Sequence, residues 1–252
     1  MTNAKWKHVW ITGASSGLGE HVARQLAAKG CAVSITARSA DKLTAIAASS
    51  DGIRAYPADV TNADDLKNVV ASAEADSGPI DLCIFCAGAW FPSKITDLKV
   101  ENFARTLDVN VMGVVNGMDA VMAGMLARGR GHMSWISSVA GYGGLPNSAA
   151  YGSSKAALIH LAESAKPELN RKGIAVSLIN PGFVKTPMTA RNDFPMPFLM
   201  EVEDGARKIV EGLEAEKFEI RFPWQLVWIL KVLNHLPYWL YFWLVRRGVF
   251  GK

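Results

Sequence analysis

The chain has 252 residues, of which 50% are hydrophobic and 20% are charged, and its formal net charge is +4. This composition is typical of a soluble globular protein and excludes a disordered chain. The small net charge, without a run of five or six basic residues, argues against nucleic acid as a partner.

The N-terminus and the cysteines predict a cytoplasmic protein. The first ten residues lack the apolar segment of a signal peptide. Cys31, Cys83 and Cys86 are too few for a disulfide framework. Cys83 and Cys86 have C-x-x-C spacing, but no second pair or nearby histidine completes a zinc site. We therefore expect packed thiols and no metal.

Short runs that favour β-structure alternate along the chain with longer helical patterns. The runs lie at 8–13, 31–38, 53–60, 81–88, 131–139 and 174–182, and a shorter one lies at 218–223. Most are apolar on both faces, as in strands that helices cover on each side. The pattern predicts a single doubly wound α/β domain of the Rossmann type, with a parallel sheet of about seven strands over residues 1–222.

The first run leads into a glycine-rich turn. Residues 12–19 read T-G-A-S-S-G-L-G and place Gly13, Gly17 and Gly19 just before a helical pattern. Glycines at such a turn let the backbone approach a pyrophosphate at the helix N-terminus. The spacing differs from the general G-x-G-x-x-G fingerprint, so the cluster alone could also be a tight turn.

The end of the second run indicates which cofactor binds. Where an acidic residue would hold the ribose 2′-hydroxyl of NAD, the chain has Ala37 and Arg38. Because arginine pairs with a 2′-phosphate, this position favours NADP(H) over NAD(H). Taken alone, Arg38 could equally be a solvated charge at a helix start.

Tyr151 and Lys155 are the candidate acid/base pair. They lie four residues apart at the start of a helical pattern and so project from one face. A nearby ammonium is expected to lower the pKa of the Tyr151 phenol. Ser138 follows the fifth run and residues 180–186 follow the sixth, at the sheet edge where α/β proteins bind ligands. A Tyr-Lys pair at this spacing is common by chance, so it establishes no site by itself.

Taken together, the ordered motifs resemble the short-chain dehydrogenase/reductase family over residues 8 to about 187. The resemblance implies that Tyr151 is the general acid/base and that Lys155 lowers its pKa and holds the nicotinamide ribose. It also implies that Ser138 orients the substrate oxygen and that Asn110 supports a proton relay. Cys86 departs from the family, which usually has asparagine there.

The same resemblance implies a cofactor site and an assembly. Asp59 would contact adenine and Thr186 the nicotinamide amide. Family members are usually homodimers or homotetramers, here through residues 97–127 and 149–171. The full set implied for NADP(H) is Gly13, Ser15, Ser16, Gly17, Leu18, Gly19, Arg38, Asp59, Val60, Ala87, Gly88, Asn110, Tyr151, Lys155, Pro181, Gly182, Val184 and Thr186.

Apolar side chains in the loops around the expected site predict a substrate class. They favour a bulky or lipid-like ketone, aldehyde or alcohol, although each could simply pack a mobile loop. A catalytically idle NADP-binding sensor is the alternative function, but it would not need the combination of Asn110, Ser138, Tyr151 and Lys155. The apolar loop residues are Trp90, Phe91, Tyr142, Leu145, Phe183, Met188, Phe194, Met196 and Phe198.

Residues 223–252 form an aromatic-rich C-terminal extension, with tryptophan at 224, 228, 239 and 243. Pro237 divides it, so we expect two short amphipathic helices at about 224–236 and 237–247 instead of a bilayer span. Lys231, Asn234 and His235 would form a polar helix face. The aromatic face suits the inner surface of a membrane, where the protein could act as a scaffold; a lid or a subunit interface is the alternative.

Overall fold

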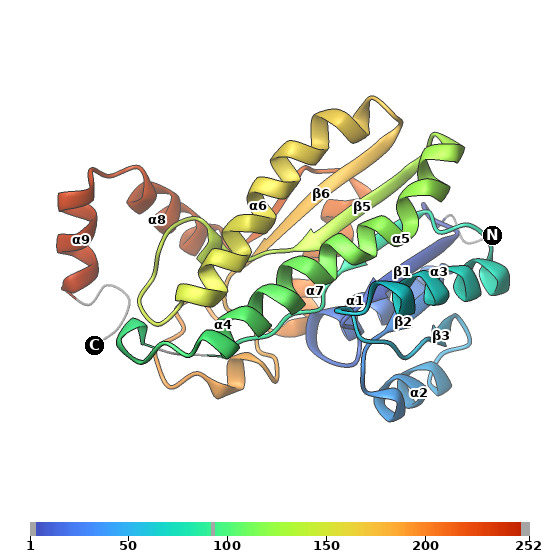
Figure 1. Ribbon diagram of the computed structural model, residues 1–252, viewed down its shortest axis with the longest axis horizontal. Coiled ribbons are helices and arrows are strands. Elements are labelled where there is room, and N and C mark those ends of the chain that lie inside the picture. The colour runs from blue at the N-terminus through green and yellow to red at the C-terminus, as the bar shows by residue number, and fades with distance from the viewer. Residues whose placement is uncertain (1–3, 92–93, 248–252) are drawn as a thin grey trace.

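The computed structural model describes residues 4–91 and 94–247. Seven parallel strands form one sheet in the order β3-β2-β1-β4-β5-β6-β7, and helices cover both of its faces (Figure 1). This confirms the predicted doubly wound α/β fold. The strands are β1 (His8–Thr12), β2 (Ala32–Thr36), β3 (Ile53–Ala55), β4 (Leu82–Phe85), β5 (Gly131–Ile136), β6 (Ile174–Pro181) and β7 (Glu219–Phe222).

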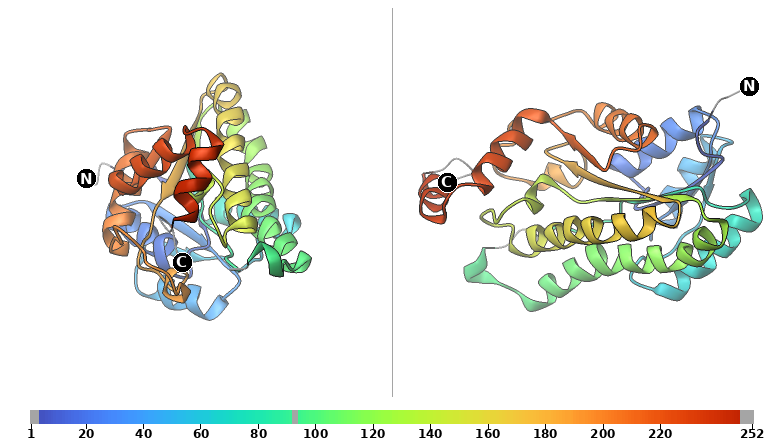
Figure 2. Two further views of the ribbon diagram at one scale, coloured as in Figure 1. Left: turned by 90° about the vertical axis from the view of Figure 1, so that its left-hand side faces the viewer. Right: turned by 90° about the horizontal axis from the view of Figure 1, so that it is seen from above.

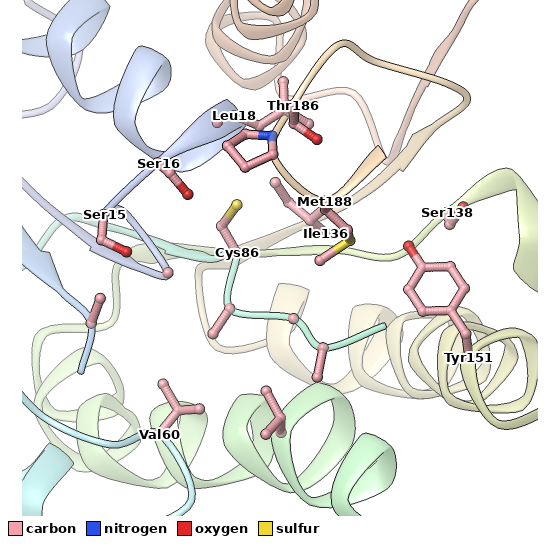
Figure 3. Close-up of a pocket in the computed structure, with 18 of the residues that line it drawn as sticks. Ser15, Ser16, Leu18, Val60, Cys86, Ile136, Ser138, Tyr151, Thr186 and Met188 are labelled. Atoms are coloured by element: carbon pink, nitrogen blue, oxygen red, sulfur yellow. The ribbon is translucent and has the colours of Figure 1, made fainter. Parts of the chain in front are cut away.

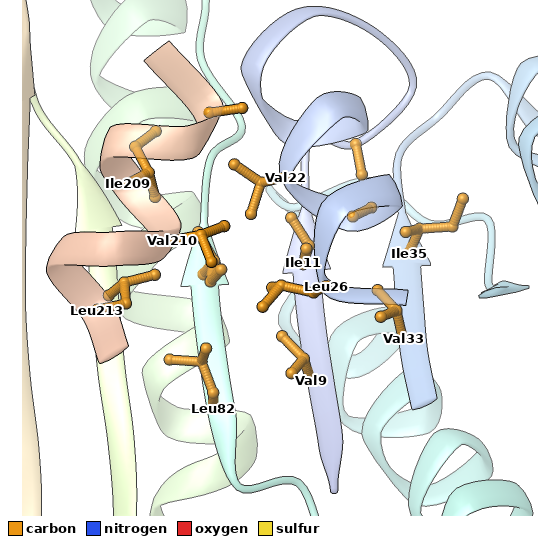
Figure 4. Close-up of a cluster of buried hydrophobic side chains, with 14 of the residues drawn as sticks. Val9, Ile11, Val22, Leu26, Val33, Ile35, Leu82, Ile209, Val210 and Leu213 are labelled. Carbon is orange, nitrogen blue, oxygen red and sulfur yellow. The ribbon is translucent and has the colours of Figure 1, made fainter. Parts of the chain in front are cut away.

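Alternate side chains of β1, β4, β5 and β6 feed two separate cores, one on each face of the sheet. Val9 and Ile11 of β1 enter the first core, where Leu26 and Ile209 meet them (Figure 4). Trp10, between them in sequence, enters the second core on the opposite face. The helices that pack the first core are α1 (Gly17–Ala28), α2 (Ala40–Ala48) and α7 (Val202–Glu214), and those that pack the second are α3 (Ala63–Ser77), α5 (Gly113–Arg128) and α6 (Ala149–Asn170).

The edge strand β3 is shorter than the run at 53–60 predicts. Its partner β2 ends at Thr36, and the pairing of the two strands ends where Ile35 lies opposite Ala55. Beyond Ala55, the backbone N–H of Tyr56 donates to the Ile35 carbonyl and that of Ala58 to the Ala37 carbonyl. The chain therefore leaves the sheet before Asp59 and brings that carboxylate near the end of β2.

The helical run Val100–Arg128 is long and apolar enough to cross a bilayer, by length and composition only. It comprises α4 (Val100–Leu107), a π-helical turn (Asp108–Met112) and α5. Val114, Val121 and Met125 of this run are buried in the second core. Packing within the fold thus explains part of its apolar character.

The C-terminal extension forms the two predicted helices, α8 (Trp224–Asn234) and α9 (Tyr238–Arg246). They lie together at one end of the molecule (Figures 1 and 2). Lys231 does not join an outward polar face as expected. It is half-buried and donates to Glu219 of β7 at 2.8 Å, because that carboxylate lies beneath α8.

Candidate active site

A cavity of about 320 Å³ lies at the carboxyl ends of the strands. Ser15 and Ser16 lie toward one end of it, and Ser138 and Tyr151 toward the other (Figure 3). The predicted site residues that line it are Gly13, Ser15, Ser16, Gly17, Leu18, Arg38, Asp59, Val60, Ala87, Gly88, Ser138, Tyr151, Lys155, Pro181, Gly182, Val184 and Thr186. Gly19 and Asn110 are not part of this lining.

The glycine-rich turn has the shape that a pyrophosphate needs. Gly13 and Gly17 adopt φ values of +69° and +59°, which favour glycine. A Cβ atom at Gly13 would lie 2.4 Å from the backbone nitrogen of Ala87, and one at Gly19 would lie 2.6 Å from the carbonyl oxygen of Gly13. Ser16 makes no side-chain cap to α1, so it leaves first-turn N–H groups for an anion. The turn therefore fits a dinucleotide, and Gly19 lets the start of α1 pack closely against the backbone of the turn at Gly13.

Arg38 and Asp59 meet at the rim of the cavity. The guanidinium lies 3.9 Å from the carboxylate, and the two side chains are 63% and 37% exposed. Ser39, which also lines the cavity, adds a hydroxyl beside them. A cation held at this point can pair with a 2′-phosphate.

Tyr151 and Ser138 face each other from different elements. The Tyr151 ring comes from α6, and its hydroxyl points toward Ser138 after β5 (Figure 3). The Ser138 hydroxyl accepts from Ala140 N–H at 3.1 Å and lies 3.4 Å from the Pro181 carbonyl oxygen. The Trp90 ring packs edge-on against Tyr151, with 5.1 Å between ring centroids. The two hydroxyls are thus fixed where one substrate oxygen could contact both.

The pKa values at this end differ from the expectation. Burial raises the pKa of Tyr151 to about 12, although hydrogen bonding with Ser138 opposes the rise. Burial lowers the pKa of Lys155 to about 8. The Lys155 ammonium lies 5.4 Å from the Tyr151 ring centroid and donates to the Ile136 carbonyl at 2.8 Å. The predicted lowering of the Tyr151 pKa is therefore wrong for the protein by itself, because desolvation dominates.

Asn110 lies behind the cavity wall and holds a neighbouring segment by hydrogen bonds. It is fully buried in the π-helical turn, and its Oδ1 accepts from the backbone N–H of Ala89 at 2.6 Å. Its Nδ2 donates to the Ala89 carbonyl at 3.1 Å and to Ser154 Oγ at 2.9 Å. These bonds clamp the segment after β4, which carries Ala87 and Gly88 along the cavity.

Of the nine predicted apolar loop residues, only two line the cavity, and Trp90, Phe194, Met196 and Phe198 are outside its lining. Phe91 and Met188 line the cavity as predicted. Tyr142, Leu145 and Phe183 instead pack against the buried faces of α8 and α9. Their assignment to the pocket is therefore a correction: the C-terminal helices cover the loops after β5 and β6, so these side chains form core beneath them.

Several cavity residues were not among the predicted site residues. Cys86, Ile136 and Ser137 directly follow or end strands β4 and β5, so the sheet-edge rule could have found them. Burial raises the pKa of the Cys86 thiol to about 11, so it is a neutral wall of the cavity. Arg105 comes from α4, and only the three-dimensional structure brings it to the cavity.

Comparison with known proteins agrees with this geometry. The family model for short chain dehydrogenases matches residues 7–194. An uncharacterized oxidoreductase of Myxococcus xanthus is 37% identical over 94% of this chain and 95% of its own length. The crystal structure of a short-chain dehydrogenase from Streptomyces avermitilis superposes with a TM-score of 0.83 at 26% identity, covering 96% of this chain and 98% of that one.

A third comparison concerns the cofactor. The structure of ElxO with NADP bound has a TM-score of 0.78 and 26% identity, and it covers 86% of this chain and 97% of that one. The Myxococcus and Streptomyces proteins match 94% and 96% of this chain. The unmatched share is smaller than the C-terminal extension 223–252, so both matches reach into that extension.

Proposed function

Because the chain belongs to the short-chain dehydrogenase family and is an oxidoreductase, we propose that it interconverts a carbonyl and an alcohol with NADP(H). The observation that carries this proposal is the meeting of Ser138, Tyr151 and Lys155 in the cavity that begins at the glycine-rich turn. When bound, the nicotinamide supplies or accepts the hydride. The residues of the chain would bind and orient the cofactor and the substrate, and they would move the proton.

Tyr151 is the proposed general acid of the reduction. With a pKa raised to about 12 by burial, its hydroxyl carries a proton at neutral pH. Ser138 would hold the substrate oxygen beside that hydroxyl and polarise it. As Tyr151 gives up its proton, the nearby Lys155 ammonium would stabilise the tyrosinate that forms. The reverse proton transfer serves alcohol oxidation.

Arg38 supports the choice of NADP(H). Its charge lies at the rim near Asp59, and the similar structure ElxO holds NADP. Gly13 and Gly17 would hold the pyrophosphate, and Lys155 the nicotinamide ribose. Asn110 would support this site through the segment that it clamps, and its part in a proton relay belongs to the same proposal.

An apolar substrate and a homo-oligomer complete the proposal. Phe91 and Met188 give the cavity apolar walls, which favours a bulky or lipid-like carbonyl. Met112 and Val115 are exposed, 47% and 37%, where the π-helical turn joins α5. Large exposed apolar side chains on a long helix favour contact between copies, in a dimer or tetramer.

The test is NADPH oxidation against carbonyls graded from short polar aldehydes to long-chain and polycyclic ketones, with NADH in parallel. We expect turnover that needs NADPH and rises with the apolar size of the substrate. Tight NADPH binding without turnover on any member of the panel, in either direction, would instead favour the idle cofactor-binding sensor.

A further inference from the structure

The two C-terminal helices are apolar on both sides. Their inner sides pack in a small core of their own with residues of the main domain. Their outer sides are exposed over most of the length of both helices, for example 80% at Tyr238 and 72% at Trp239. We call this exposed set the outer face; it comprises Trp224, Trp228, Ile229, Val232, Tyr238, Trp239, Phe242 and Trp243.

The inner side fixes the outer face beside the cavity. Leu226 of α8 packs so closely on Gly182 that a Cβ atom there would lie 2.8 Å from the leucine side chain. Val139, next to Ser138, lies in the same small core. The Tyr241 hydroxyl donates to the Gly144 carbonyl. These contacts anchor the two helices to the main domain beside the cavity residue Gly182, and the helices lie together at one end of the molecule (Figure 2).

The charge of this region has one sign. The sequence from 223 to 252 contains no aspartate or glutamate. Lys231 is already paired with Glu219 at 2.8 Å, but Arg246 and Arg247 are exposed at the end of α9. The Arg247 guanidinium lies 4.1 Å from the Trp243 ring centroid, so cation and aromatic side chain are presented together.

We propose that the outer face docks on the surface of an anionic lipid bilayer. Tryptophan and tyrosine are the side chains that settle at the boundary of headgroups and acyl chains, and basic residues beside them attract anionic lipid. A second copy of the chain fits less well, because a face paired with itself would offer Arg246 and Arg247 no carboxylate from 223–252 as a partner. If the proposed function also holds, carbonyl substrates dissolved in lipid would reach the cavity from the membrane.

The test is co-sedimentation of the full chain with vesicles of phosphatidylcholine alone or mixed with phosphatidylglycerol. We expect the protein to sediment with the mixed vesicles and to be released by high salt. The double variant Trp228→Ser/Trp239→Ser should weaken this binding by about tenfold or more, because both side chains are exposed and would enter the interface. Leu126→Ser, which removes an exposed apolar side chain of α5, should bind as the original chain does.

Two results would overturn the proposal. One is a chain that stays in the supernatant with both kinds of vesicle. The other is a double variant that still sediments fully with the mixed vesicles. If light scattering without vesicles also shows that this variant has lost self-association, a second copy of the chain covers the face instead of lipid. The measurement needs no turnover, so its failure is separate from failure of the proposed function.

Discussion

Removing the guanidinium of Arg38 should weaken the binding of NADPH much more than that of NADH. The Arg38→Ala variant loses one charge-assisted interaction with the 2′-phosphate, which costs about 1.5–3 kcal/mol in general. Arg38 is 63% exposed, so solvent screens it and the lower end applies. About 1.5 kcal/mol corresponds to about a tenfold rise in the dissociation constant for NADPH.

The assay is titration of NADPH and NADH, followed by nucleotide fluorescence, for the original chain and three variants. Arg38→Lys keeps the charge but loses the planar fork, so its affinity should fall by only about threefold. Arg171→Ala, at an exposed arginine just after α6, is the matched control and should change neither affinity. Equal losses for NADPH and NADH in Arg38→Ala would refute the assignment of Arg38 to the 2′-phosphate.

Three further predictions concern the cavity, the core and the C-terminal helices. Ser138→Ala should lower kcat by about 10²–10³ with NADPH affinity kept, because the hydroxyl acts on the substrate oxygen; steady-state kinetics showing only a change in KM would contradict this. Burial lowers the pKa of His132 to about 4, so the free energy of unfolding should fall by on the order of 3 kcal/mol as pH drops from about 6.5 to 4, because the unfolded side chain takes up a proton first. Urea unfolding should show this slope and lose it in His132→Gln, and an unchanged slope would contradict it. Leu230→Ala should lower the free energy that holds α8 in place by about 2–5 kcal/mol and so expose this helix to protease or hydrogen exchange. Trp228→Ser on the outer face should not have this effect, and equal effects of the two variants would contradict the packing described.

Much of the sheet and of the cofactor end of the cavity follows from local sequence. The apolar runs place the strands because each strand is covered on both faces, and the glycine spacing places the turn because only glycine tolerates its φ values and close contacts. Arg38, Ser138 and Tyr151 could be located by counting from strand ends and helix starts. These are features that short stretches of chain determine.

What the sequence could not predict depends on contacts between distant segments. Phe183 appeared to be a pocket residue, but α8 covers it from more than forty residues further along the chain. Arg105 reaches the cavity only because of the way α4 packs. The pKa of Tyr151 is raised by total burial, against the opposing hydrogen bond with Ser138. Spacing in the sequence predicts which side chains are neighbours on one helix or strand. It does not predict how far the complete fold removes a side chain from water, which is what shifts its pKa.

The role of Tyr151 is tested most directly by the variant Tyr151→Phe, assayed for NADPH oxidation and for NADPH binding on the same preparation. NADPH should bind with nearly the original affinity while turnover falls by about 10²–10⁴, because the phenylalanine keeps the ring against Trp90 but has no proton to give. Turnover within a few-fold of the original chain would contradict the assignment of Tyr151 as the general acid.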